Sequence, residues 1–230
     1  MPHTRKLSRR EALKGLSATA LLGLGLWPGC HSPRAKSGGT FQFIAANDLH
    51  HLSAECDPWF DALIRQLRTH DKAELALLLG DLTEKGEQEN LGAIRDHFRG
   101  LRKPIYTQIG NHDYTTATDR SAYVKLFPNQ INYAFRHRGW QFVSIDSTQG
   151  TAYTKTRIQP ETLRWLDENL PKLDPHKPTV LYTHFPLASS VQMAPLNAPE
   201  VLERFRPFNL RGCFSGHFHG YTRNQFAEAD

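Results

Sequence analysis

The sequence predicts an α/β domain, and three observations support this fold class. Short apolar runs rich in β-branched residues recur along the chain and are typical of buried strands. Between the first of these runs lie segments whose apolar residues follow helical spacing, which gives the strand–helix–strand order of a parallel sheet. Two later runs flank an Arg138-Gly139 turn and predict a hairpin, so the sheet is expected to be mixed.

Each expected strand is a short apolar run that ends in polar residues. The last two of them flank the segment from Gly216 to Gly220, which contains two histidines. The strands are expected at Phe41–Ala46, Leu75–Leu79, Ile105–Ile109, Asn132–Arg136, Gln141–Ile145, Thr179–Tyr182, Leu210–Ser215 and Tyr221–Phe226.

Helices are expected where apolar residues would form one stripe at helical spacing. A further helix is expected from Pro160 to about Leu170, because proline suits the first turn of a helix. The two stripes consist of Trp59, Phe60, Leu63, Ile64 and Leu67, and of Leu91, Ile94 and Phe98.

The segment 1–39 is interpreted as an export signal and tether. Basic residues precede the apolar run Leu16–Trp27, which is too short to span a bilayer as a helix of about 20 residues. Ser8–Lys14 resembles the twin-arginine export motif, although Ala12 replaces its usual large apolar residue. We expect an exported protein, either periplasmic or anchored on the outer side of the cytoplasmic membrane. Cys30 ends an imperfect lipoprotein box, so the sequence leaves lipid attachment open.

The basic character of the chain belongs to this signal rather than to the predicted domain. The chain has 28 Lys and Arg against 23 Asp and Glu, and seven of the bases and one of the acids precede Thr40, which leaves 21 against 22. Nucleic acids are bound through clustered Lys and Arg. We therefore expect no specific nucleic-acid binding.

The rest of the chain, residues 40–230, is long enough for one domain with a substantial core. Apart from Cys30, the whole chain contains only Cys56 and Cys213, which are too few for a disulfide framework. One bridge in an oxidising compartment and two unrelated thiols are both compatible with this count.

Asp, Asn and His side chains follow five of the expected strands. Ligands of α/β sheets bind beyond the carboxyl ends of the strands, where these loops meet. Imidazole nitrogens, carboxylate oxygens and amide oxygens are ligands suited to Zn, Mn or Fe. The strand ends supply seven such side chains, which is more than the four ligands of one tetrahedral ion. The sequence therefore predicts two ions. The strand-end segments are Asn47–His50, Gly80–Asp81, Gly110–Asp113, Thr183–Pro186 and Gly216–His219.

Two ions about 3.5–4 Å apart share a bridging ligand and stabilise both oxygens of an in-line displacement at phosphorus. Asp81 is the natural bridge, because it is the sole carboxylate at its strand end.

The ordered series Asp-x-His, Gly-Asp, Gly-Asn-His-Asp, His and Gly-His-x-His, from Asp48 to His219, resembles the motifs of the calcineurin-like metallophosphoesterase superfamily. The resemblance implies a four-layer α/β/β/α sandwich with mixed sheets. It also implies two divalent or trivalent ions (Mn, Fe or Zn) and in-line attack of a metal-bridging hydroxide on a phosphate ester. By position, one ion would be bound by Asp48, His50, Asp81 and His219, and the other by Asp81, Asn111, His184 and His217.

The resemblance further implies a catalytic pair, His112 and Asp113. His112 would donate a hydrogen bond or proton to the leaving oxygen, and Asp113 would hold its ring. His51 is expected to be a solvated loop residue, and His97 to occupy an ordinary surface position near a helix end. Tyr114, Thr115 and Glu84 lie near the expected site, and any of them could contact the substrate.

Phosphodiester hydrolysis is the preferred function, and phosphomonoester hydrolysis is the alternative. Purple acid phosphatases of the superfamily lack the first His and carry a Tyr shortly after the Gly-Asp pair, whereas this chain has His50, and Glu84 in the region of that Tyr. These motifs are more similar to the phosphodiesterase branch. A nuclease and a non-catalytic metal- or nucleotide-binding protein are further alternatives. The expected partner is a small phosphate ester, and the sequence does not indicate an oligomeric state.

Eleven residues follow His219, whereas members of the superfamily usually continue with further strands. The sequence therefore leaves open whether the last strands are present and whether the domain, residues 40–230, is complete. Substrate specificity is expected to come from the loops Tyr114–Asn129 and Ser147–Arg157.

Overall fold

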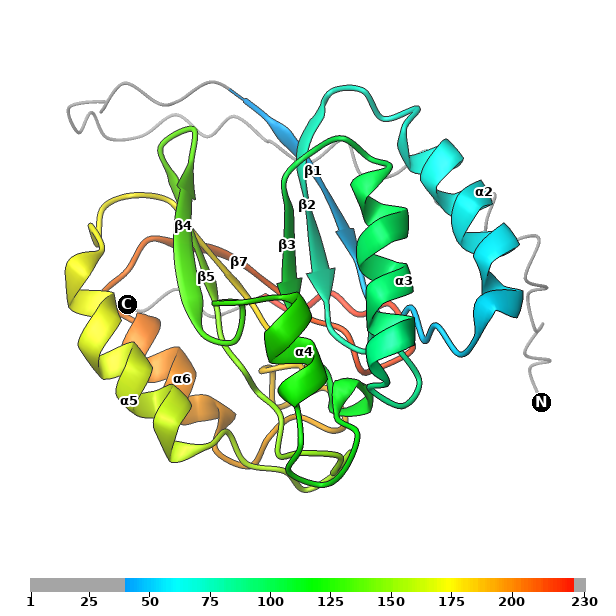
Figure 1. Cartoon of the computed structure of the whole chain (residues 1–230). Helices are drawn as coiled ribbons and strands as arrows, with labels where there is room; N and C mark the ends of the chain where they lie inside the picture. Colours follow the sequence, from blue (N-terminus) through cyan, green and yellow to red (C-terminus); the bar gives the residue numbers. More distant parts are fainter. Residues whose placement is uncertain (1–39, 226–230) are drawn as a thin grey trace, which may run out of the picture. The chain divides into compact units, whose positions relative to one another are not determined.

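The computed structural model describes residues 40–225, and the expected signal, tether and Cys30 lie outside this range. The described residues form two sheets, one of three strands and one of four, with helices beside each (Figure 1). No helix among the described residues combines the length and the apolar character needed to cross a bilayer.

The first sheet is entirely parallel, with the strand order β1-β2-β3. Its strands are β1 (Gln42–Ala46), β2 (Ala73–Leu79) and β3 (Ile105–Gln108). Helix α2 (Asp57–Leu67) connects β1 to β2, and α3 (Gln88–Arg99) connects β2 to β3. The strand–helix–strand order expected for this part of the chain is therefore confirmed.

The second sheet is mixed, with the order β4-β5-β6-β7. Strands β4 (Tyr133–His137) and β5 (Trp140–Ser144) form the expected antiparallel hairpin. Strands β6 (Thr179–Tyr182) and β7 (Leu210–Phe214) continue the sheet in parallel. Only one of the two sheets is therefore mixed within the described residues.

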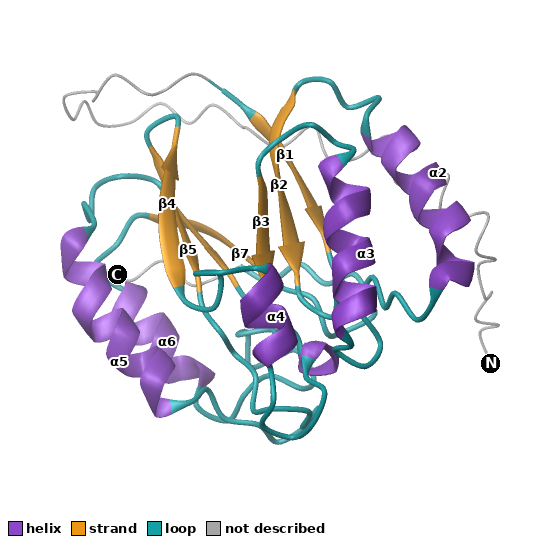
Figure 2. Ribbon diagram, viewed as in Figure 1, coloured by secondary structure: helices purple, strands orange, loops and turns teal. Residues whose placement is uncertain are grey.

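The remaining helices are short and cover the outer faces of the sheets (Figure 2). Helix α5 (Pro160–Asn169) confirms the helix expected from Pro160, while α4 (Ser121–Leu126) and α6 (Ala198–Phe205) were not expected. Three single-turn 3₁₀ helices complete the described elements: η1 (Ala54–Cys56), η2 (Asn111–Asp113) and η3 (Leu170–Lys172).

The two faces of β2 show how the layers are held together. Leu75, Leu77 and Leu79 point to one face and pack against Phe142 of β5 and its neighbours on β6. The alternate residues of β2 point to the other face, into a cluster with α2, α3 and α4. A third cluster joins the opposite face of the second sheet to α5 and α6. Because side chains alternate across a strand, these clusters give four layers, and the expected α/β/β/α sandwich is confirmed.

Three details differ from or complete the expectations. Trp59 is 57% exposed, because it adjoins the buried Phe60, and neighbouring helical residues point about 100° apart. The expected strand Tyr221–Phe226 does not form over residues 221–225, where Tyr221 is 93% exposed and buries no apolar surface; Phe226 lies outside the described residues. Cys56 and Cys213 are both free thiols, so they form no bridge.

Candidate metal centre

Loops that follow strands of both sheets bring all seven predicted ligands together. Asp81 lies at the middle, where its Oδ2 is 3.2 Å from Nε2 of His184 and 3.8 Å from Nε2 of His50. Nε2 of His184 is also 3.1 Å from Oδ1 of Asn111. On the other side, Nε2 of His219 lies 3.5 Å from Oδ1 of Asp48.

The ligand atoms fall into two adjoining groups. Asp48, His50 and His219 have ligand atoms within 4.8 Å of one another, and so do Asp81, His184 and His217. His50 and Asp81 also lie within this distance of each other and of His112, which joins the groups.

Four of these residues have a backbone conformation that non-glycine residues rarely adopt. The φ angles of Asp48, His50, Asp81 and His217 are 52°, 46°, 49° and 64°. Such left-handed conformations store about 1–3 kcal/mol each when the surrounding structure enforces them, and they cluster at functional sites. Here the main-chain nitrogen of Asp48 donates to Gly80 O, and that of His50 donates to Asp81 O. The first two strand-end loops thereby hold each other in the strained form.

Glycines before three of the ligands allow the loops to approach closely. A Cβ atom at Gly80 would lie 2.6 Å from Nδ1 of His184, and one at Gly216 would lie 2.9 Å from Oδ2 of Asp48. At Gly110 it would overlap with the main chain and carboxylate of Asp81. The glycines of the strand-end segments are therefore needed for packing.

In three of the histidines, one ring nitrogen forms a hydrogen bond with an oxygen that is not a predicted metal ligand. Nδ1 of His50 lies 2.9 Å from Oε2 of Glu84, and Nδ1 of His184 lies 2.9 Å from Leu79 O. Nε2 of His217 lies 2.8 Å from Tyr153 O. This pattern fixes the ring and its tautomer and leaves the second nitrogen for a metal, as in known metal sites.

The donor set fits metal ions. Nε2 of His50 is buried and has no hydrogen-bond partner, although it faces Asp81 at 3.8 Å. A buried nitrogen without a partner is unfavourable, and an ion between it and the carboxylate would satisfy both. Imidazole, carboxylate and amide oxygens together suit Mn, Fe or Zn.

Asp81 and His184 shift each other's pKa in opposite directions. Burial acts to raise the pKa of Asp81, but the attraction of protonated His184 and its hydrogen bond outweigh burial and lower this pKa to about 2. Burial likewise acts to lower the pKa of His184, whereas the Asp81 carboxylate raises it to about 9. The site thus already stabilises positive charge beside Asp81.

The expectation that Asp113 holds the ring of His112 is wrong. The buried carboxylate of Asp113 accepts hydrogen bonds from the main-chain nitrogens of Thr83 and Gly110, both at 2.9 Å. Burial, together with the charge of Asp81, raises the pKa of Asp113 to about 7. Asp113 therefore joins the loops after β2 and β3 and does not contact the reacting groups.

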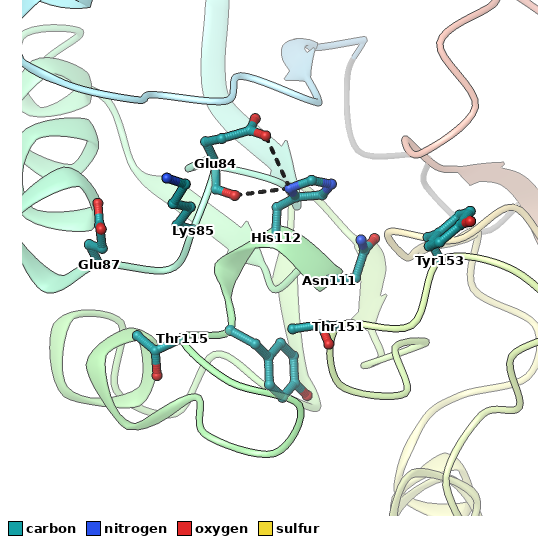
Figure 3. A pocket seen from close by; sticks show the side chains of 9 residues that line it. Glu84, Lys85, Glu87, Asn111, His112, Thr115, Thr151 and Tyr153 are labelled. Atoms are coloured by element: carbon teal, nitrogen blue, oxygen red, sulfur yellow. Dashed lines mark hydrogen bonds and ion pairs between the residues drawn. The ribbon is translucent and has the colours of Figure 1, made fainter.

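Glu84 takes the position that was expected for Asp113 (Figure 3). Nδ1 of His112 lies 3.0 Å from the main-chain oxygen of Glu84 and 3.7 Å from its carboxylate. The same carboxylate contacts His50. The sequence showed an acid three residues after Asp81, but this spacing alone did not assign it a role.

Two neighbouring cavities open at the site. One has a volume of about 560 Å³ and is lined by Glu84, Lys85 and Asn111 among others, and the other, of about 390 Å³, reaches Asp81. His112 and Tyr153 line both of them. Cavities of this size accommodate small molecules.

A four-layer α/β/β/α sandwich with His, Asp and Asn gathered beyond its strand ends defines the class of metal-binding phosphoester hydrolases. The chain belongs to the calcineurin-like phosphoesterase family, whose model matches residues 41–221. The family expected from the sequence is thereby confirmed.

Similar proteins include two named phosphodiesterases. The chain is 27% identical over 196 residues to a 3′,5′-cyclic-nucleotide phosphodiesterase of Nostoc sp., a match that covers 77% of this chain and 71% of that protein. It is 24% identical over 177 residues to the glycerophosphodiester phosphodiesterase GpdQ of Enterobacter lignolyticus, covering 69% of this chain and 60% of that one. The chain thus spans less than two thirds of the length of the second relative.

Among solved structures, the purple acid phosphatase PPD1 from yellow lupin (Lupinus luteus) seeds superposes with a TM-score of 0.57 at 14% identity. The match covers 78% of this chain and 38% of that chain. This likeness supports the fold alone.

Proposed function

We propose that the chain is a metal-dependent phosphodiesterase that acts on small phosphodiesters at the strand-end centre. The observation that carries the proposal is the position of the Asp81 carboxylate between His50 and His184, which belong to the two ligand groups. The relatives named as cyclic-nucleotide and glycerophosphodiester phosphodiesterases support a diester as the substrate.

Seven residues would hold two ions, with Asp81 shared between them. When bound, the ions would lower the pKa of a water molecule and stabilise charge on the attacking and leaving oxygens. One ion would take Asp48, His50, Asp81 and His219, and the other would take Asp81, Asn111, His184 and His217.

His112 would act on the leaving oxygen. Its Nδ1 faces the Glu84 carbonyl, an acceptor, and therefore carries a hydrogen. Nε2 can donate a proton only when the ring is doubly protonated. The Glu84 carboxylate lies 3.7 Å from Nδ1 and helps to hold the ring. Lys85 at the cavity wall supplies positive charge for the substrate phosphate.

The test compares an aryl phosphodiester with the matching aryl phosphomonoester in the presence of added Mn²⁺ or Zn²⁺. We expect faster diester hydrolysis, about two ions bound at the strand-end centre, and loss of hydrolysis in His112→Ala and Asn111→Ala with the fold retained by circular dichroism. Faster monoester hydrolysis would reverse the substrate preference. An inactive parent protein with every metal, or fewer than one bound ion, would contradict the enzyme assignment.

We also propose that the protein is exported through its twin-arginine-like segment. The pattern of bases before an apolar run supports this proposal. Replacing Arg9 and Arg10 by Lys should retain the full-length chain in the cytoplasmic fraction, and unchanged export would refute the proposal. Lipid labelling of the chain and of Cys30→Ala tests the anchor.

A further inference from the structure

A second cluster of metal-ligating side chains lies behind His50 and shares no residue with the strand-end centre. It consists of His51, Asp57 at the start of α2 and His97 in the last turn of α3. Nε2 of His51 and Nε2 of His97 each lie 2.9 Å from the same oxygen, Oδ1 of Asp57. Contrary to expectation, His51 is not solvated, since only 1% of it is exposed.

The outer ring nitrogens of both histidines face acceptors. Nδ1 of His51 lies 3.0 Å from Oδ1 of Asn90, whose amide nitrogen is already directed at Leu52 O and at the carboxylate of Glu87. Nδ1 of His97 lies 3.2 Å from Oδ1 of Asp61. Both Nδ1 atoms are therefore held by acceptors, and both Nε2 atoms are directed at the same carboxylate oxygen of Asp57, where one ion could contact all three ligand atoms.

We propose that His51, Asp57 and His97 bind a zinc ion. Two imidazole nitrogens and a carboxylate oxygen are suitable zinc ligands, and their outer nitrogens are held as in known zinc sites. Ligand atoms of a tetrahedral zinc site lie about 3.3 Å apart, so the two 2.9 Å separations need to open by only a few tenths of an ångström.

The surroundings fix the rings and leave an entry path. The ring of Phe60 is stacked on that of His97, with 5.4 Å between the ring centroids, and its centroid lies 5.3 Å from that of His51. This packing restricts the rotation of both imidazoles. The side chain of Asp57 is 41% exposed, so water can reach the fourth coordination position.

The zinc ion would stabilise the loops that carry the ligands of the strand-end centre. The main-chain nitrogen of His51 donates to Leu82 O, and its oxygen accepts from the nitrogen of Glu84. Zinc at His51 would thus tie α2 and α3 to the loops that carry His50 and Glu84, without touching a substrate.

The experiment counts zinc in the zinc-loaded, dialysed full chain by mass spectrometry. His97→Gln is the test variant, because a Gln amide can donate to Asp57 and keep the hydrogen bond but is a poor zinc ligand. His176→Gln, at an exposed histidine, is the control. We expect His97→Gln to bind one zinc ion fewer than the parent and the control, and zinc to raise its Tm less. Equal zinc content in all three proteins would overturn the proposal.

Two further variants keep the result interpretable. If circular dichroism shows that His97→Gln does not fold, Asp57→Asn, whose side chain has nearly the same size, replaces it. We then expect Asp57→Asn to bind one zinc ion fewer than the parent. Adding His97→Gln to an Asp81→Asn chain should still remove one zinc ion. The loss is then independent of the strand-end centre and of its proposed activity, and no loss in that background would also contradict the site.

Discussion

At the scale of single residues, Gly110 sets the position of Asp81. An added Cβ would overlap with the main chain and carboxylate of Asp81, so we expect Gly110→Ala to displace the shared ligand. Misplacing a catalytic group by about 1 Å lowers turnover by roughly 100-fold. Diester hydrolysis should fall by at least about this factor, together with the number of bound ions.

Gly92 provides the matched control for this change. It lies within α3, and a Cβ there would have no neighbour within 4 Å. Gly92→Ala should stabilise the protein by about 0.5–1 kcal/mol in urea unfolding, because alanine is the better helix former. Normal metal content and turnover in Gly110→Ala would show that the loop tolerates a side chain.

Glu84 orients His50 and His112 without being a predicted ligand. Removing such an outer partner typically lowers metal affinity or activity by about 10–100-fold. We expect Glu84→Ala to lower the affinity of the strand-end centre by this factor in competition with a chelator. Glu161→Ala, an exposed change on α5, should leave the affinity unchanged. Equal affinities of the two variants would remove Glu84 from the site.

The sequence predicted which residues gather at the strand-end centre, but not every partner within it. Carboxyl ends of parallel strands share one edge of a sheet, so strand-end residues could be grouped without coordinates. Spacing does not give the direction of a side chain inside a loop. His50 has a left-handed φ of 46°, and His51, the next residue, is buried behind it with Asp57. For the same reason, the role of holding the ring of His112 was assigned to Asp113 rather than to Glu84.

At the scale of elements, Glu74 joins the start of β2 to the turn of the β4–β5 hairpin. Its Oε2 lies 2.7 Å from both Nε of Arg138 and Nε2 of His137. The hydrogen bond from Arg138 is the main cause that lowers the pKa of Glu74 below its usual 4.5. A lowered pKa of an acid stabilises the fold above the unfolded pKa, and this contribution is lost as pH falls through the folded pKa.

We therefore expect Glu74→Gln to lower the Tm slightly at neutral pH and low salt. The difference from the parent should decrease as the pH falls below 4.5 and through the lowered pKa of Glu74. It should also shrink in 1 M NaCl, because exposed ion pairs are screened. Thermal unfolding followed by circular dichroism measures it. A Tm difference that does not change with pH or salt would point to packing rather than charge.

Helices of three turns could be predicted, and shorter ones could not. In α3, Leu91, Ile94 and Phe98 give a clear stripe, and all three are buried. Helix α6 buries Ala198, Val201 and Phe205 with similar spacing, but it has only eight residues. A pattern of two turns does not stand out from chance, and its stability comes from packing against the second sheet.

At the scale of the whole molecule, Phe142 packs between the two sheets. It is fully buried, stacks on Phe135 at 4.8 Å and meets the edge of Phe43 at 5.8 Å. Phe142→Ala should reduce the free energy of unfolding by about 3–5 kcal/mol, a large share of the about 5–15 kcal/mol typical of domains.

Urea unfolding measures this loss, with Trp59→Ala as the control. Trp59 is 57% exposed, so its removal should have a much smaller effect. Similar losses for the two variants would mean that the inter-sheet cluster contributes no more than the surface of α2.

The division into two sheets was expected only through the family resemblance. Strand β2 is apolar on both faces, because one face packs against helices and the opposite face packs against the second sheet. Without alternation, its pattern does not tell what covers each face. What covers each face was therefore read from the resemblance rather than from the strand itself.

The hydrogen bond between His217 and Tyr153 does not depend on which side chain occupies position 153. Its acceptor is the main-chain oxygen of Tyr153, whereas the Tyr153 side chain, 62% exposed, lines both cavities. Every amino acid provides that oxygen. Position 153 is therefore free to acquire new side chains, and with them new substrates, while the anchor of a metal ligand is inherited unchanged.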